Sequence, residues 1–129
     1  MTAKAKKKEA RARAVIRKGT GKIKINKLNL ECVEPKYVRL YISEPLELAG
    51  PLAKEVDIDV SVKGGGFMGQ AVSARAAIAK ALLRIHKSSE LKQKFLKYDR
   101  MLLVDDPRRT EPKKPLGTGA RAKKQKSKR

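Results

Sequence analysis

Hydrophobic and polar residues alternate along two stretches of the chain, and this period of two predicts β-strands. In the clearer stretch, from Val56 to Val62, every second residue is β-branched and the residues between are polar, as in a sheet with one buried face. In the earlier stretch small apolar residues alternate with cations, and a Gly-Thr-Gly turn leads into a second alternating run. Residues 11–26 are therefore predicted to form a β-hairpin with one cationic face. The cations of that face are Arg11, Arg13 and Arg17.

Apolar residues recur at spacings of three and four after residue 70, which predicts a long amphipathic helix. Its apolar positions are Ala71, Ala74, Ile78, Leu82 and Ile85. Ser88 is suited to cap a second helix, and Pro35 is suited to the first turn of an earlier one that gives way to a new turn at residues 43–45. The short apolar run of residues 101–104 predicts a buried strand.

The order of these elements predicts the fold. A strand, a helix and a strand in succession favour parallel pairing of residues 55–63 with residues 101–104, in one sheet with the hairpin. The expected class is α+β, a two-layer α/β sandwich in which a mixed four-stranded sheet carries helices on one face.

The positive charge of the chain is concentrated at its ends. Lys and Arg number 33 against 13 Asp and Glu, and residues 1–14 and 107–129 supply +14 of the net +20. A field of this size implies a polyanionic partner. Nucleic acid or an anionic membrane surface would supply that negative charge. No apolar run could span a bilayer or serve as a signal peptide, which favours a soluble, intracellular protein, and we expect nucleic acid and no membrane as its partner. We predict a basic N-terminal arm (1–10), a globular RNA-binding domain (11–106) and an extended basic tail (107–129).

A glycine-rich loop joins the strand of residues 56–62 to the long helix. Gly64-x-Gly66-x-x-Gly69 satisfies the dinucleotide fingerprint, but no acidic residue ends a following strand as that fold requires. A Walker A loop is excluded because Gln70 stands where Lys is needed. Either the glycines only permit a sharp turn, or the loop contacts a phosphodiester backbone, which the net charge favours. The candidate phosphate contacts are Gly64, Gly65, Gly66, Gln70 and Arg75.

The tail offers almost nothing to bury, and its cations are spread evenly among prolines and glycines. A run of this kind is often only a disordered, solubilising segment. Its even spacing instead suits an extended segment that follows a folded polyanion. The candidate phosphate contacts here are Arg108, Arg109, Lys113, Lys114, Arg121, Lys123, Lys124, Gln125 and Lys126.

Residues with catalytic or metal-binding potential are few. One Cys and one His cannot build a structural zinc site, and His86 has no evident carboxylate partner for acid–base work. Asp105 and Asp106 are better explained by pairing with nearby arginines. We expect no enzyme activity, catalytic residue, metal, cofactor or small-molecule substrate. Two alternatives stay open: a chromatin-type protein that coats duplex DNA, and an RNA-acting enzyme.

Several motifs together resemble one family. They are Gly19-x-Gly21-x-Ile23-x-Ile25-Asn26, Gly64-Gly65-Gly66-x-x-Gly69-Gln70-Ala71, Ala74-Arg75-x-x-Ile78-Ala79-x-Ala81-Leu82, Asp106-Pro107-Arg108-Arg109 and the ending Ser127-Lys128-Arg129. Spread over nearly the whole chain, they resemble small-subunit ribosomal protein nine. Lys126 stands where an aromatic residue commonly precedes the serine, and with Pro112 it gives the chain an archaeal look.

The resemblance implies a fold, a place and a set of partners. The fold would be like the second domain of small-subunit ribosomal protein five, with a left-handed βαβ crossover. The protein would be a structural, cytoplasmic component of the ribosome that binds 16S-type rRNA in the 30S head beside neighbouring head proteins. The tail would reach the peptidyl site, where Ser127, Lys128 and Arg129 would contact the anticodon stem-loop of the tRNA.

Overall fold

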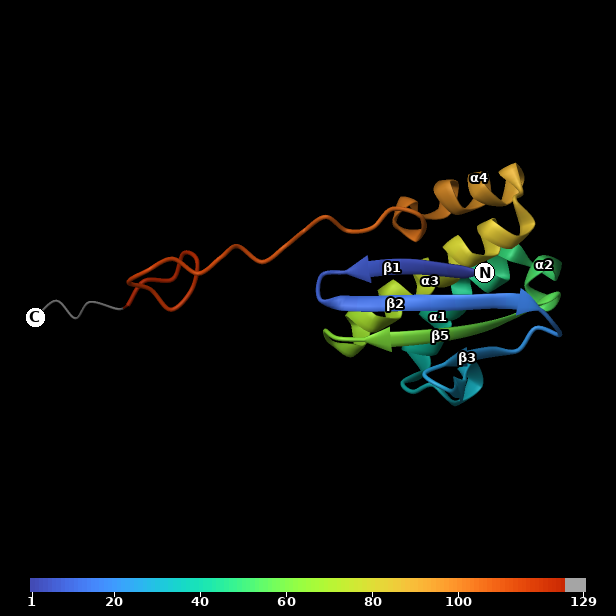
Figure 1. Ribbon diagram of the computed structural model, residues 1–129, viewed down its shortest axis with the longest axis horizontal. Coiled ribbons are helices and arrows are strands. Elements are labelled where there is room, and N and C mark those ends of the chain that lie inside the picture. Colours follow the sequence, from blue (N-terminus) through green and yellow to red (C-terminus); the bar gives the residue numbers. More distant parts are fainter. Residues whose placement is uncertain (125–129) are drawn as a thin grey trace, which may run out of the picture.

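A five-stranded mixed sheet forms one layer of the protein, and helices cover one of its faces (Figure 1). The computed structural model describes residues 1–124. The strands are β1 (Thr2–Lys7), β2 (Ala10–Lys18), β3 (Ile23–Ile25), β4 (Leu28–Asn29) and β5 (Val56–Lys63). The helices are α1 (Lys36–Ala49), α2 (Pro51–Lys54), α3 (Phe67–His86) and α4 (Ser89–Tyr98), with short 3-10 helices η1 (Leu30–Cys32) and η2 (Arg100–Leu102). The predicted two-layer α+β class is confirmed, with a fifth strand in the sheet.

Strand β5 lies at the centre of the sheet, whose order is β1-β2-β5-β3-β4. It pairs with β2 in antiparallel and with β3 in parallel orientation, and the outer pairs β1–β2 and β3–β4 are antiparallel. The alternation that predicted β5 is present in its burial, because Val56, Ile58, Val60 and Val62 are buried. A strand with β-branched residues on one face is well suited to the middle of such a sheet.

The predicted hairpin of residues 11–26 is wrong, because β5 lies between β2 and β3. The turn after β2 is tied to β5 instead of folding β3 back onto β2. Asp57 of β5 accepts hydrogen bonds from the backbone N–H groups of Thr20 (2.9 Å) and Lys22 (2.8 Å). These bonds, that of Lys22 first, lower the pKa of the Asp57 carboxyl below its ordinary value. Gly19 is required here, since a Cβ atom would lie 2.1 Å from Asp57 Cγ.

Residues 1–10 were predicted to form a free basic arm, but they contribute the edge strand β1 instead. Each residue from Thr2 to Lys7 pairs with a residue of β2, so the hairpin of this fold is β1–β2. Ala3 and Ala5 are fully or almost fully buried, while Lys4 between them is exposed. The first residues thus repeat the alternation of β2, with alanine as the apolar residue.

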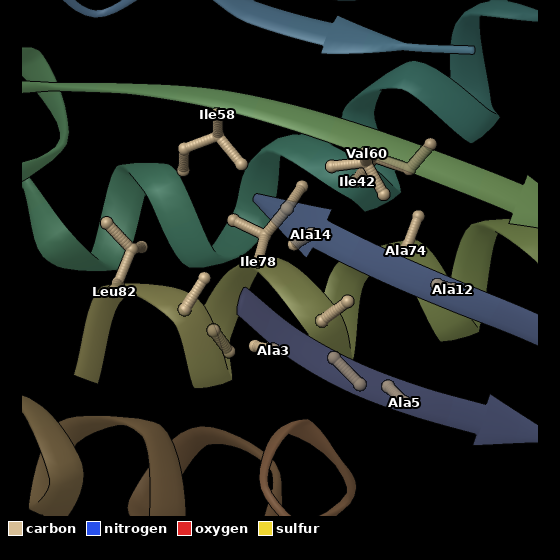
Figure 2. Packing of buried hydrophobic residues seen from close by; sticks show 14 of the residues in the cluster. Ala3, Ala5, Ala12, Ala14, Ile42, Ile58, Val60, Ala74, Ile78 and Leu82 are labelled. Atoms are coloured by element: carbon tan, nitrogen blue, oxygen red, sulfur yellow. The ribbon is translucent and has the colours of Figure 1, made fainter. Parts of the chain in front are cut away.

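Small residues meet across the interface between the sheet and α3. Figure 2 shows Ala3 and Ala5 of β1 and Ala12 and Ala14 of β2 facing the helix that carries Ala74, Ile78 and Leu82. Alanines on both sides allow a helix and a sheet to approach closely, and larger residues of β5, α1 and α3 complete the core. The predicted long helix and the predicted cap of the next are both confirmed, as Ser88 Oγ accepts from the backbone N–H of Leu91 at 3.3 Å.

Two further predicted elements are wrong. Residues 101–104 form no strand: η2 ends at Leu102, which is fully buried, and Asp99 Oδ1 accepts from the N–H of Met101 at 2.8 Å. The parallel pair of the sheet is therefore β3–β5, connected through α1 and α2. Helix α1 also continues through Pro45, where a new turn was expected. The left-handed crossover and the likeness to protein five stay predictions.

The chain after the domain leads away from it (Figure 1). Residues 107–124 contain no helix or strand, and a single bridge joins Gly117 to Lys123. Glu111 pairs with Lys114 at 3.3 Å and with Arg121 at 3.0 Å, so the segment turns back on itself there. Within the described chain, no helix is long and apolar enough to cross a bilayer.

Candidate nucleic-acid interface

The face of the sheet opposite the helices is lined with cations. Residues that pair across strands point to the same side, so the register gives the arrangement directly. Lys6, Arg11 and Lys63 form one row across β1, β2 and β5, and Lys4, Arg13 and Ser61 form the next. Most of these side chains are exposed, with Lys6 half-buried. We call this surface the open face.

The predicted cations of β2 all lie on the open face. Arg11, Arg13 and Arg17 are exposed, as the alternation required. Arg17 lies opposite Asp57, whereas Arg11 has Lys6 and Lys63 as its partners. Positive charge is therefore densest at the end of β2 that follows the β1–β2 turn.

Four open-face lysines were not singled out from the sequence. Two of them lie in the segment that was predicted to be a free arm. One lies a single residue beyond the alternating run that predicted β5. The alternation of Lys with Ala in residues 2–7 was a signal that could have found the first two. The four are Lys4, Lys6, Lys24 and Lys63.

The glycine loop lies at the cationic end of the sheet, and its first two glycines are explained by the fold. Gly64 and Gly65 have φ angles of 78° and 65°, which favour glycine. A Cβ atom on Gly64 would lie 2.6 Å from the carbonyl oxygen of Glu9, in the β1–β2 turn. The turn interpretation therefore accounts for these two residues.

The rest of the loop remains available to a ligand. Gly66 is exposed, and a Cβ atom there would meet nothing within 4 Å. No side chain caps α3, so N–H groups of its first turn lack a capping acceptor. Gln70 is half-buried, and its Nε2 donates to the carbonyl oxygen of Gly64 at 3.2 Å, which supports the loop from below. The structure thus brings Gly66 and Gln70 beside the open-face cations.

Arg75 cannot contact RNA as predicted, because it is 4% exposed. Its Nε lies 2.6 Å from Glu44 Oε2, and its Nη1 donates to Asp99 Oδ2 at 2.9 Å and to the hydroxyl of Tyr41 at 2.7 Å. The guanidinium also stacks on the Tyr41 ring, 4.4 Å from its centroid. Arg75 therefore joins α1, α3 and the end of α4.

The root of the tail is fixed to β1 by Asp106, which is 3% exposed. Arg108 donates to Asp106 from its backbone N–H (3.0 Å), its Nε (2.9 Å) and its Nη2 (2.6 Å), and Lys7 at the end of β1 pairs with the same carboxylate. The guanidinium of Arg108, and then Lys7, hold the pKa of Asp106 well below its usual range. Asp106 in turn raises the pKa of Arg108. The tail thus begins beside the cationic end of the open face.

We predict that Asp106→Asn lowers the thermal unfolding temperature at neutral pH and that the difference narrows in acid. The folded-state pKa of Asp106 lies below its unfolded value of about 3.9, so its carboxylate stabilises the protein above that pH. This contribution is lost as the pH falls toward the folded-state pKa. Thermal unfolding of the unmodified protein and of Asp106→Asn from pH 7 to pH 2 measures how the difference in unfolding temperature changes with pH. The control is Asp105→Asn, whose side chain is 49% exposed. A difference in unfolding temperature that does not change with pH would contradict the stabilising role assigned to the Asp106 carboxylate.

The other predicted tail residues fall into three groups. Arg109 donates to the backbone carbonyls of Asp106 and Arg108. Exposed side chains belong to Lys113, Lys114, Arg121, Lys123 and Lys124. Predictions for Gln125, Lys126, Ser127, Lys128 and Arg129 concern residues outside those that the structure describes.

No group of three or more potential metal ligands occurs within residues 1–124. The interface therefore consists of cations, exposed loop backbone and an extended tail, all of which suit the phosphate backbone of a nucleic acid.

Comparison with known proteins identifies the family. The model of the family described as ribosomal protein S9/S16 matches residues 5–129. The chain belongs to this family. The small ribosomal subunit protein uS9 of Methanococcus maripaludis strain C5 is 50% identical over 124 residues, which is 95% of this chain and 92% of that protein. The uS9 protein of Pyrobaculum aerophilum is 52% identical over 122 residues, covering 95% of this chain and 86% of that protein.

Membership in the S9 family gives the coarse function. The protein is a structural component of the small ribosomal subunit, where its partners are rRNA and other ribosomal proteins, and it is not an enzyme. The chromatin-type and enzymatic alternatives are thereby set aside. The archaeal look of the sequence agrees with these archaeal relatives.

Proposed function

We propose that the protein binds 16S-type rRNA in the 30S head through one continuous surface, made of the open face, the glycine loop around Gly66 and the tail. The observation that carries this proposal is the row of Lys6, Arg11 and Lys63, which lies between the loop and the root of the tail. A net charge of +20 supports it, because phosphate contacts dominate the affinity of such proteins. The tail then extends the surface beyond the domain.

The experiment measures binding of the full chain to a transcript of the head rRNA at several salt concentrations. If roughly 6 to 10 phosphates are contacted, log K against log salt has a slope of about −0.7 to −0.9 per contact. Duplex DNA of equal length, competed at matched salt, is the control for nonspecific coating. A slope near zero, or equal affinity for the DNA, would overturn the proposal.

The family resemblance adds a role for the end of the tail. We propose that Ser127, Lys128 and Arg129 contact the tRNA in the peptidyl site. Two cations and a hydroxyl group can together make charge-assisted hydrogen bonds to a phosphate backbone.

We predict that small subunits carrying the deletion of residues 127–129 assemble normally but bind peptidyl-site tRNA more weakly, by about 1 to 2 kcal/mol. The charge reversal of Lys128 and Arg129 to glutamate has a larger effect, because it adds repulsion. Filter binding of tRNA to purified subunits measures both variants. Unchanged tRNA affinity in both would show that the end of the tail is only solvated.

A further inference from the structure

A hollow of about 490 Å³ lies on the open face, apart from the densest row of cations. Arg13 of β2, Lys24 of β3 and Lys27 after β3 line it, together with Asp59 of β5. Val15, which is half-buried, gives it an apolar patch. Cavities of this size hold small ligands of roughly the bulk of one nucleotide.

The turn between β3 and β4 holds the wall of this hollow in place. Asn26 and Lys27 both have positive φ angles, 48° and 71°, which is the geometry of a tight hairpin turn. The side chain of Asn26 pairs with β5 as a strand would, since its Oδ1 accepts from Val62 N (2.8 Å) and its Nδ2 donates to Val62 O (3.3 Å). Lys27 is therefore carried on a turn fixed to the centre of the sheet.

Asp59 is the exception in this cationic surrounding. Its neighbours across the sheet are Val15 and Lys24, and it is exposed. The ion pairs formed within residues 1–124 involve other carboxylates, so Asp59 has both oxygens available as acceptors. Asp57, two residues earlier, instead holds the turn after β2. A carboxylate on a phosphate-binding surface is unfavourable unless it has a donor of its own to bind.

We propose that this hollow holds one unpaired nucleotide of the rRNA, with the base donating to Asp59 and the flanking phosphates contacting Arg13, Lys24 and Lys27. The inference rests on the proposed rRNA binding by the open face. Guanine is the expected base, because its N1–H and N2–H donors lie side by side and match the two oxygens of a carboxylate. Cytosine and adenine offer an amino group alone, and uracil offers only its N3–H.

The sign of the effect of Asp59→Asn distinguishes this role from a purely electrostatic one. Removing a negative charge from a surface that binds phosphate strengthens RNA binding if Asp59 makes no contact. If Asp59 accepts from a base, the variant binds the head rRNA transcript about tenfold more weakly, as expected for one lost base contact. The salt slope stays unchanged. Lys24→Ala also weakens binding but lowers the magnitude of the slope by about 1.

The matched control is Glu90→Gln, which makes the same charge change in the first turn of α4, in the helical layer. It leaves rRNA affinity unchanged or slightly raised. Base preference is tested with an 11-nucleotide oligouridine and the same oligomer with one central guanine. The full chain binds the guanine-containing RNA more tightly, and Asp59→Asn abolishes that preference. Thermal unfolding confirms that the variants are folded.

Three outcomes would overturn the inference. Equal or tighter rRNA binding by Asp59→Asn, with normal incorporation of the variant into subunits, would show that Asp59 only offsets neighbouring charge. Unchanged transcript affinity with loss of the variant from assembled subunits would assign Asp59 to a basic group of a neighbouring protein. Failure of the unmodified chain to bind the transcript would contradict the proposed rRNA binding itself. If the unmodified chain binds with the expected salt slope, the Asp59 variants test the role of Asp59 alone.

Discussion

Replacing Arg75 with alanine is expected to lower the free energy of unfolding by about 3 kcal/mol. Removing one partner of a buried ion pair costs roughly 3 to 5 kcal/mol, because the remaining charge stays desolvated. The lower end applies here, since the side chains of Glu44 and Asp99 are 24% and 32% exposed and regain some water. The stacking on Tyr41 is lost as well. Urea unfolding followed by circular dichroism at pH 7 measures the change.

Two further variants separate the fork geometry of Arg75 from its charge. Arg75→Lys keeps the charge but cannot bind Glu44 and Asp99 at once through a planar guanidinium, so an intermediate loss is expected. Arg13→Ala removes the same charge from the exposed open face and should change stability by less than about 0.5 kcal/mol. If Arg75→Ala lowers the free energy of unfolding no more than Arg13→Ala does, the buried ion pairs do not stabilise the fold.

The elements that could be predicted from the sequence are those whose signal is local. The long α3, the cap at Ser88 and the alternation of β5 each follow from neighbours within a few residues. Strand pairing failed because it is decided by distant residues. The turn at residues 19–22 is held by Asp57, which lies more than 30 positions further on, and no pattern near the turn shows this.

Alanine explains why β1 was missed. It is a weak hydrophobic residue, so alternation of Ala with Lys looks like a basic arm until the alanines of α3 are known to press against it. The prediction of a strand at residues 101–104 was wrong for the opposite reason, because a clear apolar signal was assigned to the wrong element. Their apolar character reflects burial of Leu102 beneath the helical layer, and burial alone does not separate a strand from a short helical turn.

Residues of the candidate site could be predicted where strand alternation alone sets the face on which a side chain lies. They could not be predicted where contacts between distant elements decide its position. Arg11, Arg13 and Arg17 follow from alternation alone and lie on the open face. Arg75 was assigned to the glycine loop because of its basic character. Its position four residues after Ala71, on the apolar side of α3, was a signal of burial. Its partners come from two other helical segments, which the sequence does not bring together.

The tail allows a second large effect to be tested. A chain that ends after Thr110 lacks eight of the ten basic residues in 107–129 but keeps Asp106 with Arg108. We expect this variant to bind the head rRNA transcript about 100-fold more weakly near 0.15 M salt, if about half of the removed cations contact phosphate. The log–log salt slope falls in magnitude by roughly 3 to 4, because about 0.7 to 0.9 is lost with each contact. Titration of labelled transcript at several salt concentrations measures both quantities.

The domain itself should not change on this truncation, because the removed residues that the structure describes bury almost nothing. Its urea midpoint therefore stays within error of the full chain, which separates lost contacts from lost folding. A full-length chain with residues 111–129 in shuffled order is the matched control. It keeps every charge, so it restores most of the rRNA affinity if the tail acts as a polycation. It does not restore tRNA binding in assembled subunits, because the Ser127-Lys128-Arg129 end is then displaced. Full rRNA affinity of the truncated chain would confine binding to the domain.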